Sequence, residues 1–478
     1  MTETLTPDIC VIGAGSGGLT VAAASAKFGV DVVLIEKGKM GGDCLNYGCV
    51  PSKATIAAAK HAASFRSAPD FGVTFDTPKI DYQKVHDHIH DVIATIAPMD
   101  SVERFEGLGV HVILDAAKFI DKETVEAGGK RIKARRFVIA TGSRAAVPPV
   151  PGLADIDYLT NETIFDLTEP AGRLLVVGGG PIGMELAQAQ ARLGNTVTVV
   201  EMAKTLAKDD QEMAEIVRES IRADGVTLLE ETRLESISQL ADGSVEAKVT
   251  NSAGEQTLVA DKVLVAAGRA PVLDGLNLEA AGVTYTSRGI TVSKYLKTSN
   301  PKIFAIGDCA GGLQFTHVAG YHAGLVVGQL LFRAPLAENR DMVPWVTFTS
   351  PELAHVGLTE AQARKTAKHG MHVKVLSWSY HENDRAIAER KTKGMIKVVV
   401  GKGGKILGAD IVGEGAGEMI NMWSLAVSSG LKISALRNMI SPYPTMAEIG
   451  KRAALLYYAD SVKSPMVRRI ITFLRRFG

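Results

Sequence analysis

The sequence predicts an α/β fold in which one strand–turn–helix–strand unit occurs twice, with a smaller α+β domain after it. Three observations carry this prediction. The chain has 478 residues, which is too long for a single core and favours two to four domains. An apolar strand leads into a glycine-rich turn and a helix at residues 8–38, and the same pattern returns at 174–204. From Pro344 onward, alternating patterns such as GMIKVVV and KILGADIVG are typical of strands.

The first copy has the sequence DICVIGAGSGGLTVAAASAKFGVDVVLIEKG, in which Gly13, Gly15 and Gly18 form a G-x-G-x-x-G pattern after an apolar strand. In such a turn the first glycine permits the tight bend, the second lets the backbone approach a pyrophosphate, and the third lets the helix pack on the strand. The helix N-terminus then faces the phosphates with its partial positive charge. Glu36 ends the next strand, where its carboxylate can accept hydrogen bonds from a ribose.

The second copy, LLVVGGGPIGMELAQAQARLGNTVTVVEMAK, repeats these features with Gly178, Gly180, Gly183 and the acid Glu201. One glycine turn alone is weak evidence, but two copies in the same context predict two Rossmann-like dinucleotide-binding domains. Two dinucleotides in one protein indicate that electrons pass between them. An acid at position 201 favours a free 2′-hydroxyl and therefore NADH, although Lys204 close by keeps NADPH open.

Each copy is followed by β-rich segments that close on a short apolar strand and a glycine. These strands are FVIATG, ending at Gly142, and VLVAAG, ending at Gly268. The linker AAVPPVPG follows the first of them and marks a domain boundary. The predicted domains are a discontinuous first nucleotide domain at 1–150 and 272–335, a second nucleotide domain at 151–271, and the α+β domain at 336–478.

The composition argues against several classes of protein. The chain has 53 Lys and Arg residues against 52 Asp and Glu, a net charge of +1 that gives no support to nucleic-acid binding. Its start, MTETLTPD, lacks the basic segment and apolar stretch of a secretory signal. Four cysteines in a chain of this length do not predict a secreted disulfide framework, so we expect a cytoplasmic protein in a reducing compartment.

The segment GGDCLNYGCVPSK, residues 41–53, holds two of the four cysteines, Cys44 and Cys49. Five residues of regular helix rise about 7.5 Å, whereas the Cα atoms of a disulfide lie roughly 4.4–6.8 Å apart. The glycines of the segment let the chain enter a helix irregularly and bring Cys44 back over Cys49, which then lies near a helix N-terminus that stabilises a thiolate. We therefore expect a redox pair. The alternatives are two buried structural thiols and half of a zinc site, although Cys10 and Cys309 are isolated and supply no second pair.

The same segment closely resembles the active-site signature of the flavoprotein disulfide reductases, the class I pyridine nucleotide-disulfide oxidoreductases that include dihydrolipoamide dehydrogenase, glutathione reductase and mercuric reductase. The likeness continues through ATGSR, AAGRAP, AIGDCAGG and VTFTSPELAHVGLTEAQA, nearly from end to end. It implies FAD on the first fingerprint, with Glu36 at the adenosine ribose and Asp308 at the ribityl chain. It further implies NADH on the second fingerprint, a cofactor contact from His317, and a C-terminal dimerisation domain that makes a homodimer.

The resemblance also implies roles at the reacting centre. Hydride would pass to FAD, and FAD would reduce the Cys44–Cys49 disulfide, with Cys49 as the thiolate beside the flavin and Cys44 as the interchange thiol. Lys53 and Glu185 match the ion pair near the reactive flavin nitrogen, which makes Lys53 a cofactor contact as well. One departure from the family is Pro181, because relatives often have an aromatic residue there that covers the flavin until nicotinamide arrives.

The family's acid–base group is a histidine in an H-P-x-x-x-E pattern near the C-terminus. Here the stretch is SPYPTMAE, in which Tyr443 replaces the histidine and Glu448 is retained. A phenol with a reference pKa of about 10 is a poor base at neutral pH, although it can donate a hydrogen bond. Mercuric reductase resembles the chain here, since it also has a tyrosine, and two thiolates beside a phenol suit a thiophilic metal ion. Its C-terminal cysteine pair and N-terminal metal domain have no counterpart, which implies a relative without the delivery apparatus.

Two weaker signals remain. VHDHIHDVI places His86 and His90 on one helical face with His88 nearby, which could bind a transition metal, but we expect a solvated polar face and no resident metal site. The tail at 464–478, SPMVRRIITFLRRFG, interleaves four arginines with apolar residues and resembles a basic amphipathic helix on an anionic membrane. Packing on its own protein or on a dimer partner is the alternative for this tail.

The first functional hypothesis is a FAD-dependent NAD(P)H oxidoreductase whose Cys44–Cys49 pair passes electrons to a metal ion or a small electrophilic or disulfide acceptor, in the manner of mercuric reductase. The alternative is a disulfide reductase of the dihydrolipoamide dehydrogenase kind, in which tyrosine compensates for histidine. A hypothesis of another class is a flavin-bound sensor or membrane-associated protein without turnover.

Overall fold

The computed structural model describes residues 3–366, 372–460 and 464–477. By its internal contacts the chain divides into two compact units, each discontinuous in sequence. Unit 1 comprises Met1–Gly179, Ala189–Met202 and Glu231–Asn339, and unit 2 comprises Gly180–Gln188, Ala203–Glu230 and Arg340–Gly478. This division does not follow the three predicted domains, whose boundaries stay a prediction.

Unit 1 is built on a parallel sheet that begins with the first glycine unit. Its five strands lie in the order β20-β8-β2-β3-β4 and all pair in parallel. Their bounds are β2 (Ile9–Ile12), β3 (Val32–Glu36), β4 (Val110–Leu114), β8 (Arg136–Ile139) and β20 (Ile303–Ala305). Most are continuous buried apolar runs, as expected for a parallel sheet that is covered on both faces.

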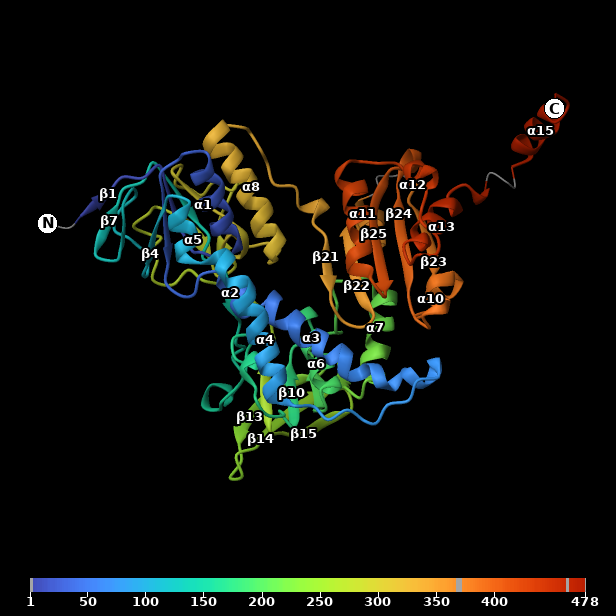
Figure 1. Cartoon of the computed structure of the whole chain (residues 1–478), viewed down its shortest axis with the longest axis horizontal. Coiled ribbons are helices and arrows are strands. Elements are labelled where there is room, and N and C mark those ends of the chain that lie inside the picture. Colours follow the sequence, from blue (N-terminus) through green and yellow to red (C-terminus); the bar gives the residue numbers. More distant parts are fainter. Residues whose placement is uncertain (1–2, 367–371, 461–463, 478) are drawn as a thin grey trace. The chain divides into compact units, whose positions relative to one another are not determined.

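Helices α1 (Ser16–Lys27) and α8 (Thr316–Phe332) pack side by side on one face of this sheet (Figure 1). The small residues Ala22 and Ala323, one on each helix, share this core with Val11 of β2. Such small side chains allow two helices to lie close together on a strand surface. The first strand–turn–helix–strand prediction is thus confirmed.

The opposite face of the sheet carries a second core, which contains Cys10 and Val33, the neighbours of the residues that face α1. A small sheet in the order β1-β7-β6-β5 covers it, Ile290 of one two-stranded ribbon joins it, and unit 1 contains a second ribbon as well. Their bounds are β1 (Thr4–Leu5), β5 (Lys118–Phe119), β6 (Val125–Ala127), β7 (Lys130–Ile132), β9 (Ser143–Ala145) with β17 (Arg269–Pro271), and β18 (Tyr285–Thr286) with β19 (Gly289–Ile290).

The segment between β3 and β4 is mostly helical. It forms α2 (Gly42–Asn46), α3 (Cys49–Ala63), α4 (Tyr82–Ile96) and α5 (Val102–Gly107). Helices α3 and α4 pack together, with Ala59, Ala62 and Tyr82 in one core. Asp81 begins α4 by accepting a hydrogen bond from the Lys84 N–H. Short 3₁₀ turns in unit 1 are η1 (Ser64–Arg66), η2 (Ala68–Phe71), η3 (Ala97–Asp100), η4 (Leu153–Asp155), η5 (Ile164–Asp166) and η6 (Gly307–Ala310).

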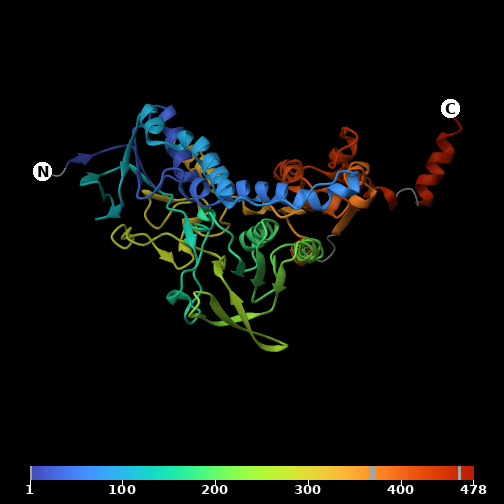
Figure 2. The same ribbon diagram turned by 60° about the horizontal axis from the view of Figure 1, so that its bottom comes forward.

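The second glycine unit repeats the arrangement of the first. In unit 1 the strands β10 (Arg173–Val177), β11 (Thr196–Val200) and β16 (Lys262–Val265) pair in parallel in the order β11-β10-β16. Helix α6 (Pro181–Arg192) follows β10 in sequence. Figure 2 shows the antiparallel strands β13 (Arg233–Gln239), β14 (Val245–Asn251) and β15 (Gly254–Ala260) as a twisted yellow-green sheet. The predicted repeat of the unit is confirmed.

Unit 2 contains the predicted α+β domain, orange to red in Figure 1. Its five strands pair antiparallel in the order β21-β22-β25-β24-β23. Their bounds are β21 (Trp345–Thr347), β22 (Glu352–Gly357), β23 (Lys374–Ser379), β24 (Met395–Val400) and β25 (Ile406–Gly413). The buried rings of Tyr380 and Trp423 belong to the core between this sheet and its helices.

The helices of unit 2 cover this sheet, since α11 packs on β22 and β25 while α13 packs on β23 and β24. The elements outside the sheet are α7 (Gln211–Ala223), β12 (Thr227–Leu229), η7 (Arg340–Met342), α9 (Glu360–Thr366), η8 (Tyr380–Glu382), α10 (Asp384–Ala388), η9 (Lys402–Gly404), α11 (Ala416–Ser428), α12 (Ile433–Asn438) and α13 (Glu448–Leu456). Lys397 of β24 donates to Asp210, the N-cap of α7, at 2.9 Å.

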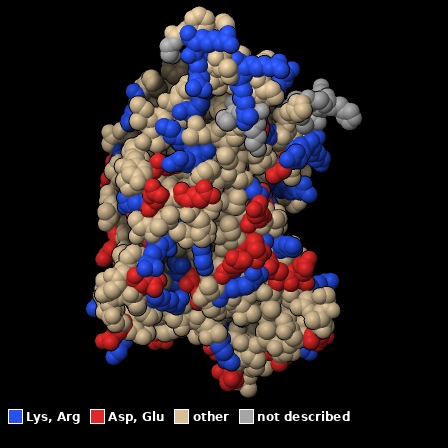
Figure 3. Space-filling model, turned by 90° about the vertical axis from the view of Figure 1, so that its right-hand side faces the viewer, with Lys and Arg blue, Asp and Glu red and all other residues tan. Residues whose placement is uncertain are grey.

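The tail forms the predicted helix, α15 (Pro465–Leu474), and none of its residues is buried. Its apolar side chains remain exposed at Met466, Ile470, Ile471, Phe473 and Leu474. In the view of Figure 3, Lys and Arg side chains gather at the top. Among the described residues, no helix is both long and apolar enough to cross a membrane.

Candidate active site

The first fingerprint forms a tight turn between β2 and α1. Gly13 has a φ of +105°, and a Cβ there would lie 2.4 Å from the carbonyl oxygen of Ala140. A Cβ on Gly18 would lie 1.8 Å from the carbonyl oxygen of Gly13, so a larger residue would push α1 away. At Gly15, by contrast, the nearest atom to a Cβ would be the Gly42 Cα at 4.0 Å. The backbone is thus open where a pyrophosphate must approach, which fits FAD.

The acids of the two fingerprints occupy the same position. Glu36 accepts hydrogen bonds from the Ala14 N–H at 2.6 Å and the Gly38 N–H at 2.7 Å. Glu201 likewise accepts from the Gly179 N–H at 2.7 Å. Each acid therefore braces the residue after the first glycine of its turn. A carboxylate has about four acceptor sites, so both can also accept from a ribose hydroxyl, a role that stays a prediction.

The second fingerprint has the strained first glycine as well. Gly178 has a φ of +114°, and a Cβ there would lie 2.5 Å from the carbonyl oxygen of Ala266. Among the described residues nothing lies within 4 Å of a Cβ placed on Gly180. Gly183 is buried in α6, and Pro181 begins this helix, a position where its missing N–H costs no hydrogen bond. This turn fits a second dinucleotide.

The glycines that close the two β-rich segments have a structural explanation. Gly142 and Gly268 have φ values of +67° and +121°, which favour glycine. Each follows, by two residues, an alanine whose carbonyl lies against the first glycine of a fingerprint turn. Ala140 lies against Gly13 in the first copy, and Ala266 lies against Gly178 in the second. The closing segments therefore hold the phosphate-binding turns in place.

The cysteine segment begins against the first fingerprint. Gly41 and Gly42 have φ values of +85° and +60°, and the Gly41 N–H donates to the Ala14 carbonyl at 3.0 Å. A Cβ on Gly42 would lie 2.7 Å from the Gly15 Cα. Only glycine permits this approach, so the segment is attached directly to the turn that fits FAD.

The two cysteines lie on different helices. Helix α2 ends at Asn46, and α3 begins at Cys49 after the N-cap Gly48. A Cβ on Gly48 would lie 3.0 Å from the Asp43 carbonyl oxygen, so this glycine lets the chain fold back tightly. The side chains of Cys44 and Cys49 are hydrogen-bonded as free thiols. The predicted break in the helix brings the pair together.

The environment of the pair shifts the pKa values of the two thiols in opposite directions. The hydrogen bond from Cys44 lowers the pKa of Cys49 to about 6, against the raising effect of burial. The same bond, together with burial, raises the pKa of Cys44 far above its ordinary value. The Thr316 hydroxyl, whose Oγ1 lies 3.2 Å from the Cys49 Sγ, and the Lys53 charge also lower the pKa of Cys49. At neutral pH the pair therefore holds a thiolate at Cys49 and a thiol at Cys44.

Two helix N-termini meet at the Cys49 sulfur. Cys49 is the first residue of α3, and Thr316 is the first residue of α8. Partial positive charge at both ends favours an anion at this sulfur. Thr316 is not among the residues that the sequence predicts for the site. Its neighbour His317, a predicted cofactor contact, is exposed and stacks on Phe315, with ring centroids 5.2 Å apart.

A polar network that the sequence analysis missed lies beside the pair. Asp308 accepts a hydrogen bond from the Ser143 hydroxyl at 2.5 Å, and Arg269 donates to the same hydroxyl at 2.7 Å. Arg269 also lies 3.0 Å from Asp43, which accepts from Asn161. The network thus ties α2, the β9–β17 ribbon and Asp308 together. Its sequence signals were the ATGSR and AAGRAP motifs, which contain Ser143 and Arg269 but reveal neither partner.

Burial raises the pKa of Asp308, and the Ser143 hydrogen bond and the Arg269 charge oppose that effect. An arginine held beside a mostly buried carboxylate orients it for a polar ligand. The Asp308 carboxylate is therefore placed to accept from a hydroxyl chain, as the resemblance implies for the ribityl group of FAD. This role stays a prediction.

Lys53 and Glu185 belong to different units. The Lys53 Nζ donates to the Ser52 hydroxyl at 3.4 Å in unit 1. Glu185 is buried in unit 2, where it accepts from the Phe348 N–H at 2.8 Å. Their predicted ion pair at the flavin stays a prediction.

Tyr443 lies in unit 2 and is 68% exposed. Its hydroxyl donates to Asp384 of α10 at 2.9 Å, and this bond raises the pKa of Tyr443 above its usual value. Glu448 begins α13 nearby and acts in the same direction through its charge. Asp384 was not predicted, because the family pattern supplies only the glutamate.

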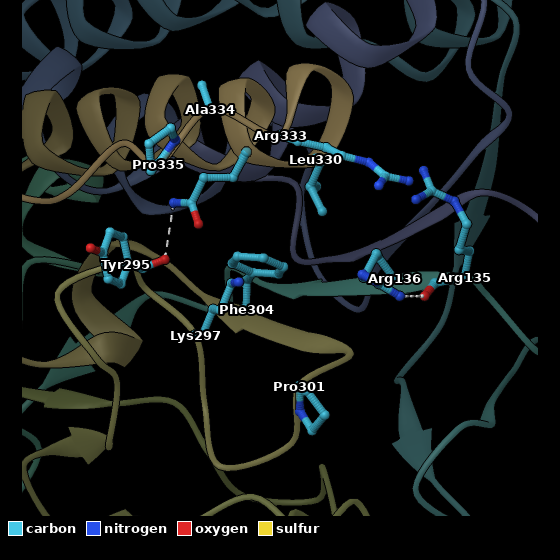
Figure 4. A pocket seen from close by; sticks show the side chains of 11 residues that line it. Arg135, Arg136, Tyr295, Lys297, Pro301, Phe304, Leu330, Arg333, Ala334 and Pro335 are labelled. Atoms are coloured by element: carbon cyan, nitrogen blue, oxygen red, sulfur yellow. Dashed lines mark hydrogen bonds between the residues drawn. The ribbon is translucent and has the colours of Figure 1, made fainter.

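A separate cavity of about 440 Å³ in unit 1 contains none of the predicted site residues. Its cations lie near the C-terminal end of α8, where helix carbonyls attract positive charge. Figure 4 shows the side chains of Arg135 and Arg333 directed toward each other across this cavity. Arg135 also pairs with Asp8 at 3.0 Å.

Comparison with known proteins agrees with this geometry. The family model described as pyridine nucleotide-disulphide oxidoreductase matches residues 7–323, and the one described as its dimerisation domain matches residues 343–454. The chain belongs to the pyridine nucleotide-disulphide oxidoreductase family. It is accordingly a FAD-dependent enzyme that uses NAD(P)H, and it carries the family's dimerisation domain, which supports a homodimer. Because the members of this family are enzymes, the comparison argues against the hypothesis of a flavin-bound sensor without turnover.

Individual relatives span nearly the whole chain. Mercuric reductase of Bacillus cereus is 36% identical over 460 residues, which cover 95% of this chain and 72% of that protein. Dihydrolipoyl dehydrogenase of Staphylococcus aureus is 34% identical over 456 residues, which cover 94% and 96%. A solved Cu(II) complex of the HOCl-induced flavoprotein disulfide reductase RclA from Escherichia coli has a TM-score of 0.82 and 29% identity, covering 93% of this chain and 98% of that chain.

Proposed function

We propose that this oxidoreductase passes electrons from NADH through Cys44 and Cys49 to a thiophilic metal ion or another small electrophile. The proposal rests chiefly on Tyr443. Reduction of an organic disulfide expels a thiolate, which a positioned acid–base assists by roughly 10²- to 10⁴-fold. The Asp384 hydrogen bond raises the pKa of Tyr443, so the phenol stays protonated at neutral pH and makes a poor base.

The proton balance separates the two kinds of acceptor. With a divalent metal ion, NADH + M²⁺ gives NAD⁺ + M⁰ + H⁺, so a proton is released. With an organic disulfide, NADH + H⁺ + RSSR gives NAD⁺ + 2 RSH, so a proton is consumed. A site without an acid–base histidine suits the first reaction better than the second.

The thiol pair suits a soft cation. Cys49 is exposed and Cys44 half-buried, so an acceptor can reach them. Thiolates prefer soft metals, and the Cys44 thiol would release its proton to water when an ion binds, because coordination favours the thiolate. Bound FAD would supply the capacity to accept a hydride from the nicotinamide and to reduce the sulfur pair by two electrons. Cys49 would face FAD, and Cys44 would meet the acceptor.

The chain offers residues for both cofactors. The turn at Gly13, Gly15 and Gly18 would hold the FAD pyrophosphate, and Asp308 would hold its ribityl chain. The second turn would hold the nicotinamide dinucleotide. Glu201 favours NADH, because a carboxylate would repel the 2′-phosphate of NADPH.

In a homodimer, Tyr443 of the partner subunit would reach the acceptor side of the cysteine pair. This arrangement follows the family's design, in which the C-terminal domain completes the site. It is supported by the exposure of Tyr443 and by the dimerisation domain at residues 343–454.

The test is a steady-state screen of NADH oxidation with Hg(II), Cu(II), lipoamide, glutathione disulfide and quinones, with the pH change followed in weakly buffered solution. We expect turnover with a metal ion, release of a proton, and loss of both in Cys49→Ser. Robust lipoamide turnover with proton uptake, abolished by Cys49→Ser, would instead establish the alternative, a disulfide reductase of the dihydrolipoyl dehydrogenase kind.

We further propose that helix α15 contacts an anionic membrane surface. Its support is the exposed apolar set of α15 and four arginines, Arg468, Arg469, Arg475 and Arg476. A helix of this composition lies in the interface between lipid headgroups and water.

A further inference from the structure

The second cluster of ligand-type side chains lies outside the cysteine site. His86 and His90 are one turn apart on α4, and the structure adds Asp166 from η5, a residue some eighty positions away. One ligand atom from each of the three lies within 4.8 Å of the other two. The His86 and His90 rings are 4.1 Å apart between centroids. All three residues belong to unit 1.

The His90 Nε2 atom has no hydrogen-bond partner among the described residues. It is inaccessible to water, yet it makes no hydrogen bond of acceptable geometry. Asp166 Oδ1 lies 3.3 Å from it. Buried polar atoms in native proteins are normally satisfied, so a ring nitrogen that makes no hydrogen bond and has a carboxylate 3.3 Å away is a candidate metal ligand.

The spacing fits a metal ion. Tetrahedral ligands at the usual Zn²⁺ distances of about 2.0–2.1 Å lie roughly 3.3 Å from one another. The His90–Asp166 separation already has that value. Small rotations of the His86 ring would complete the set of three. The side chains of His86 and Asp166 are 25% and 61% exposed, so an ion can approach the cluster from their side.

The surrounding structure holds the ligands in place. Ile89, between the histidines, is buried and fixes the face that α4 presents. Ile164 and Phe165 are buried and anchor η5 just before Asp166. Asp87 lies 3.2 Å from the His86 Nδ1, which leaves the other ring nitrogen for a metal. Such a carboxylate behind a ligating histidine is the usual second partner in zinc sites.

We propose that His86, His90 and Asp166 bind one divalent transition-metal ion of the Zn²⁺ type, which ties α4 to η5. Two imidazoles and one carboxylate suit Zn²⁺, Co²⁺ or Ni²⁺, whereas Mg²⁺ and Ca²⁺ prefer oxygen ligands. The site is independent of the cysteine pair and of the proposed acceptor.

The test uses chelator-treated holoenzyme with the cysteine pair oxidised, so that no thiolate competes. Titration with ZnCl₂ by calorimetry should show one ion per chain. His86→Ala, His90→Ala and Asp166→Asn should each weaken binding by at least about 10-fold. The matched control is His88→Ala, because His88 is exposed on the same helix but points from another face, and its binding should equal that of the wild type.

A second measurement guards against misfolding. Each variant should keep its bound FAD, and Zn²⁺ should raise the melting temperature of the wild type and of His88→Ala but not of the three ligand variants. Co²⁺ should give d–d bands without a thiolate charge-transfer band. Binding that is absent from the wild type, or unchanged in folded His90→Ala and Asp166→Asn, would overturn the proposal.

Discussion

The thiol segment (residues 41–53) and the tyrosine segment (residues 441–448) differ in how many contacts a single chain makes around their reactive groups. The chemistry of the family requires both segments. In the thiol segment, Thr316, Lys53 and the start of α3 surround the Cys49 sulfur, and all belong to unit 1. Tyr443 is largely exposed and bonds to an exposed aspartate. Residues of the same unit thus surround the Cys49 sulfur, whereas the role proposed for Tyr443 depends on a second subunit.

The two regions also differ in the direction of their pKa shifts. Hydrogen bonds lower the pKa of Cys49 because they stabilise its charged form. The bond to Asp384 raises the pKa of Tyr443 because it stabilises the neutral phenol. The thiol segment stabilises a negative charge and the tyrosine segment stabilises a neutral group, which suits an acceptor that takes up no proton.

The largest expected effect comes from Cys49→Ser, which removes the thiolate of the thiol segment. We expect acceptor-dependent NADH oxidation to fall by at least ~1,000-fold, because a serine hydroxyl can neither form the disulfide nor hold a metal ion. Cys309→Ser is the control, since the Cys309 thiol is buried and donates to the Ile306 carbonyl, which serine can also do. A Cys49→Ser enzyme within 10-fold of the wild type would contradict the role of the pair.

The second change is Tyr443→His, which restores the acid–base group of the disulfide reductases. We expect lipoamide reduction to rise by roughly 100-fold and metal-ion reduction to stay within a few-fold. Tyr443→Phe, which removes the hydroxyl alone, should raise neither activity. Steady-state rates with both acceptors measure this effect. No gain with lipoamide in a folded, FAD-loaded Tyr443→His enzyme would show that more than the missing histidine excludes disulfides.

The third change, Thr316→Val, tests what lowers the pKa of Cys49 in the thiol segment. The alkylation rate of Cys49 by iodoacetamide should decrease as the pH falls through about 6, because the reactive thiolate becomes protonated there. Thr316→Val should move this midpoint upward by about one unit, which lowers the rate most between pH 5 and 7. Ser64→Ala, at the far end of α3, is the control and should leave the profile unchanged. A midpoint that stays near 6 in Thr316→Val would refute the contribution of that hydroxyl.

The smallest expected effect concerns α15. Replacing its four arginines with glutamine should reduce cosedimentation with phosphatidylserine vesicles by about 10-fold and leave NADH oxidation unchanged. Vesicles of phosphatidylcholine provide the control. Equal sedimentation of the variant and the wild type would indicate that the tail packs on protein instead.

Much of the site could be predicted because its backbone leaves a mark in the sequence. Gly13, Gly18 and Gly178 stand where any Cβ would collide with a carbonyl, so the chain must have glycine there. A Cβ on Gly42 would lie 2.7 Å from the Gly15 Cα and one on Gly48 would lie 3.0 Å from the Asp43 carbonyl oxygen, so these glycines mark the fold of the cysteine segment. These constraints act over a few residues, and a local pattern therefore reveals them.

The partners of charged and polar groups could not be predicted in this way. Arg269 meets Asp43 and Ser143 across more than a hundred residues of sequence. Asp384 binds Tyr443 from a helix that precedes it by fifty-nine positions. Each of these residues is an ordinary polar residue in its own segment, and nothing local distinguishes it from a solvated one.

The sequence by itself determined the two nucleotide units, the cysteine pair and the replacement of histidine by tyrosine, because periodicity, steric exclusion at glycine and residue chemistry are local properties. The tertiary structure alone decided that the Thr316 hydroxyl supports the Cys49 thiolate, which acid raises the pKa of the phenol, and that an aspartate lies beside two histidines on α4. Those outcomes depend on electrostatic contacts between distant segments, and such contacts exist only after the chain has folded.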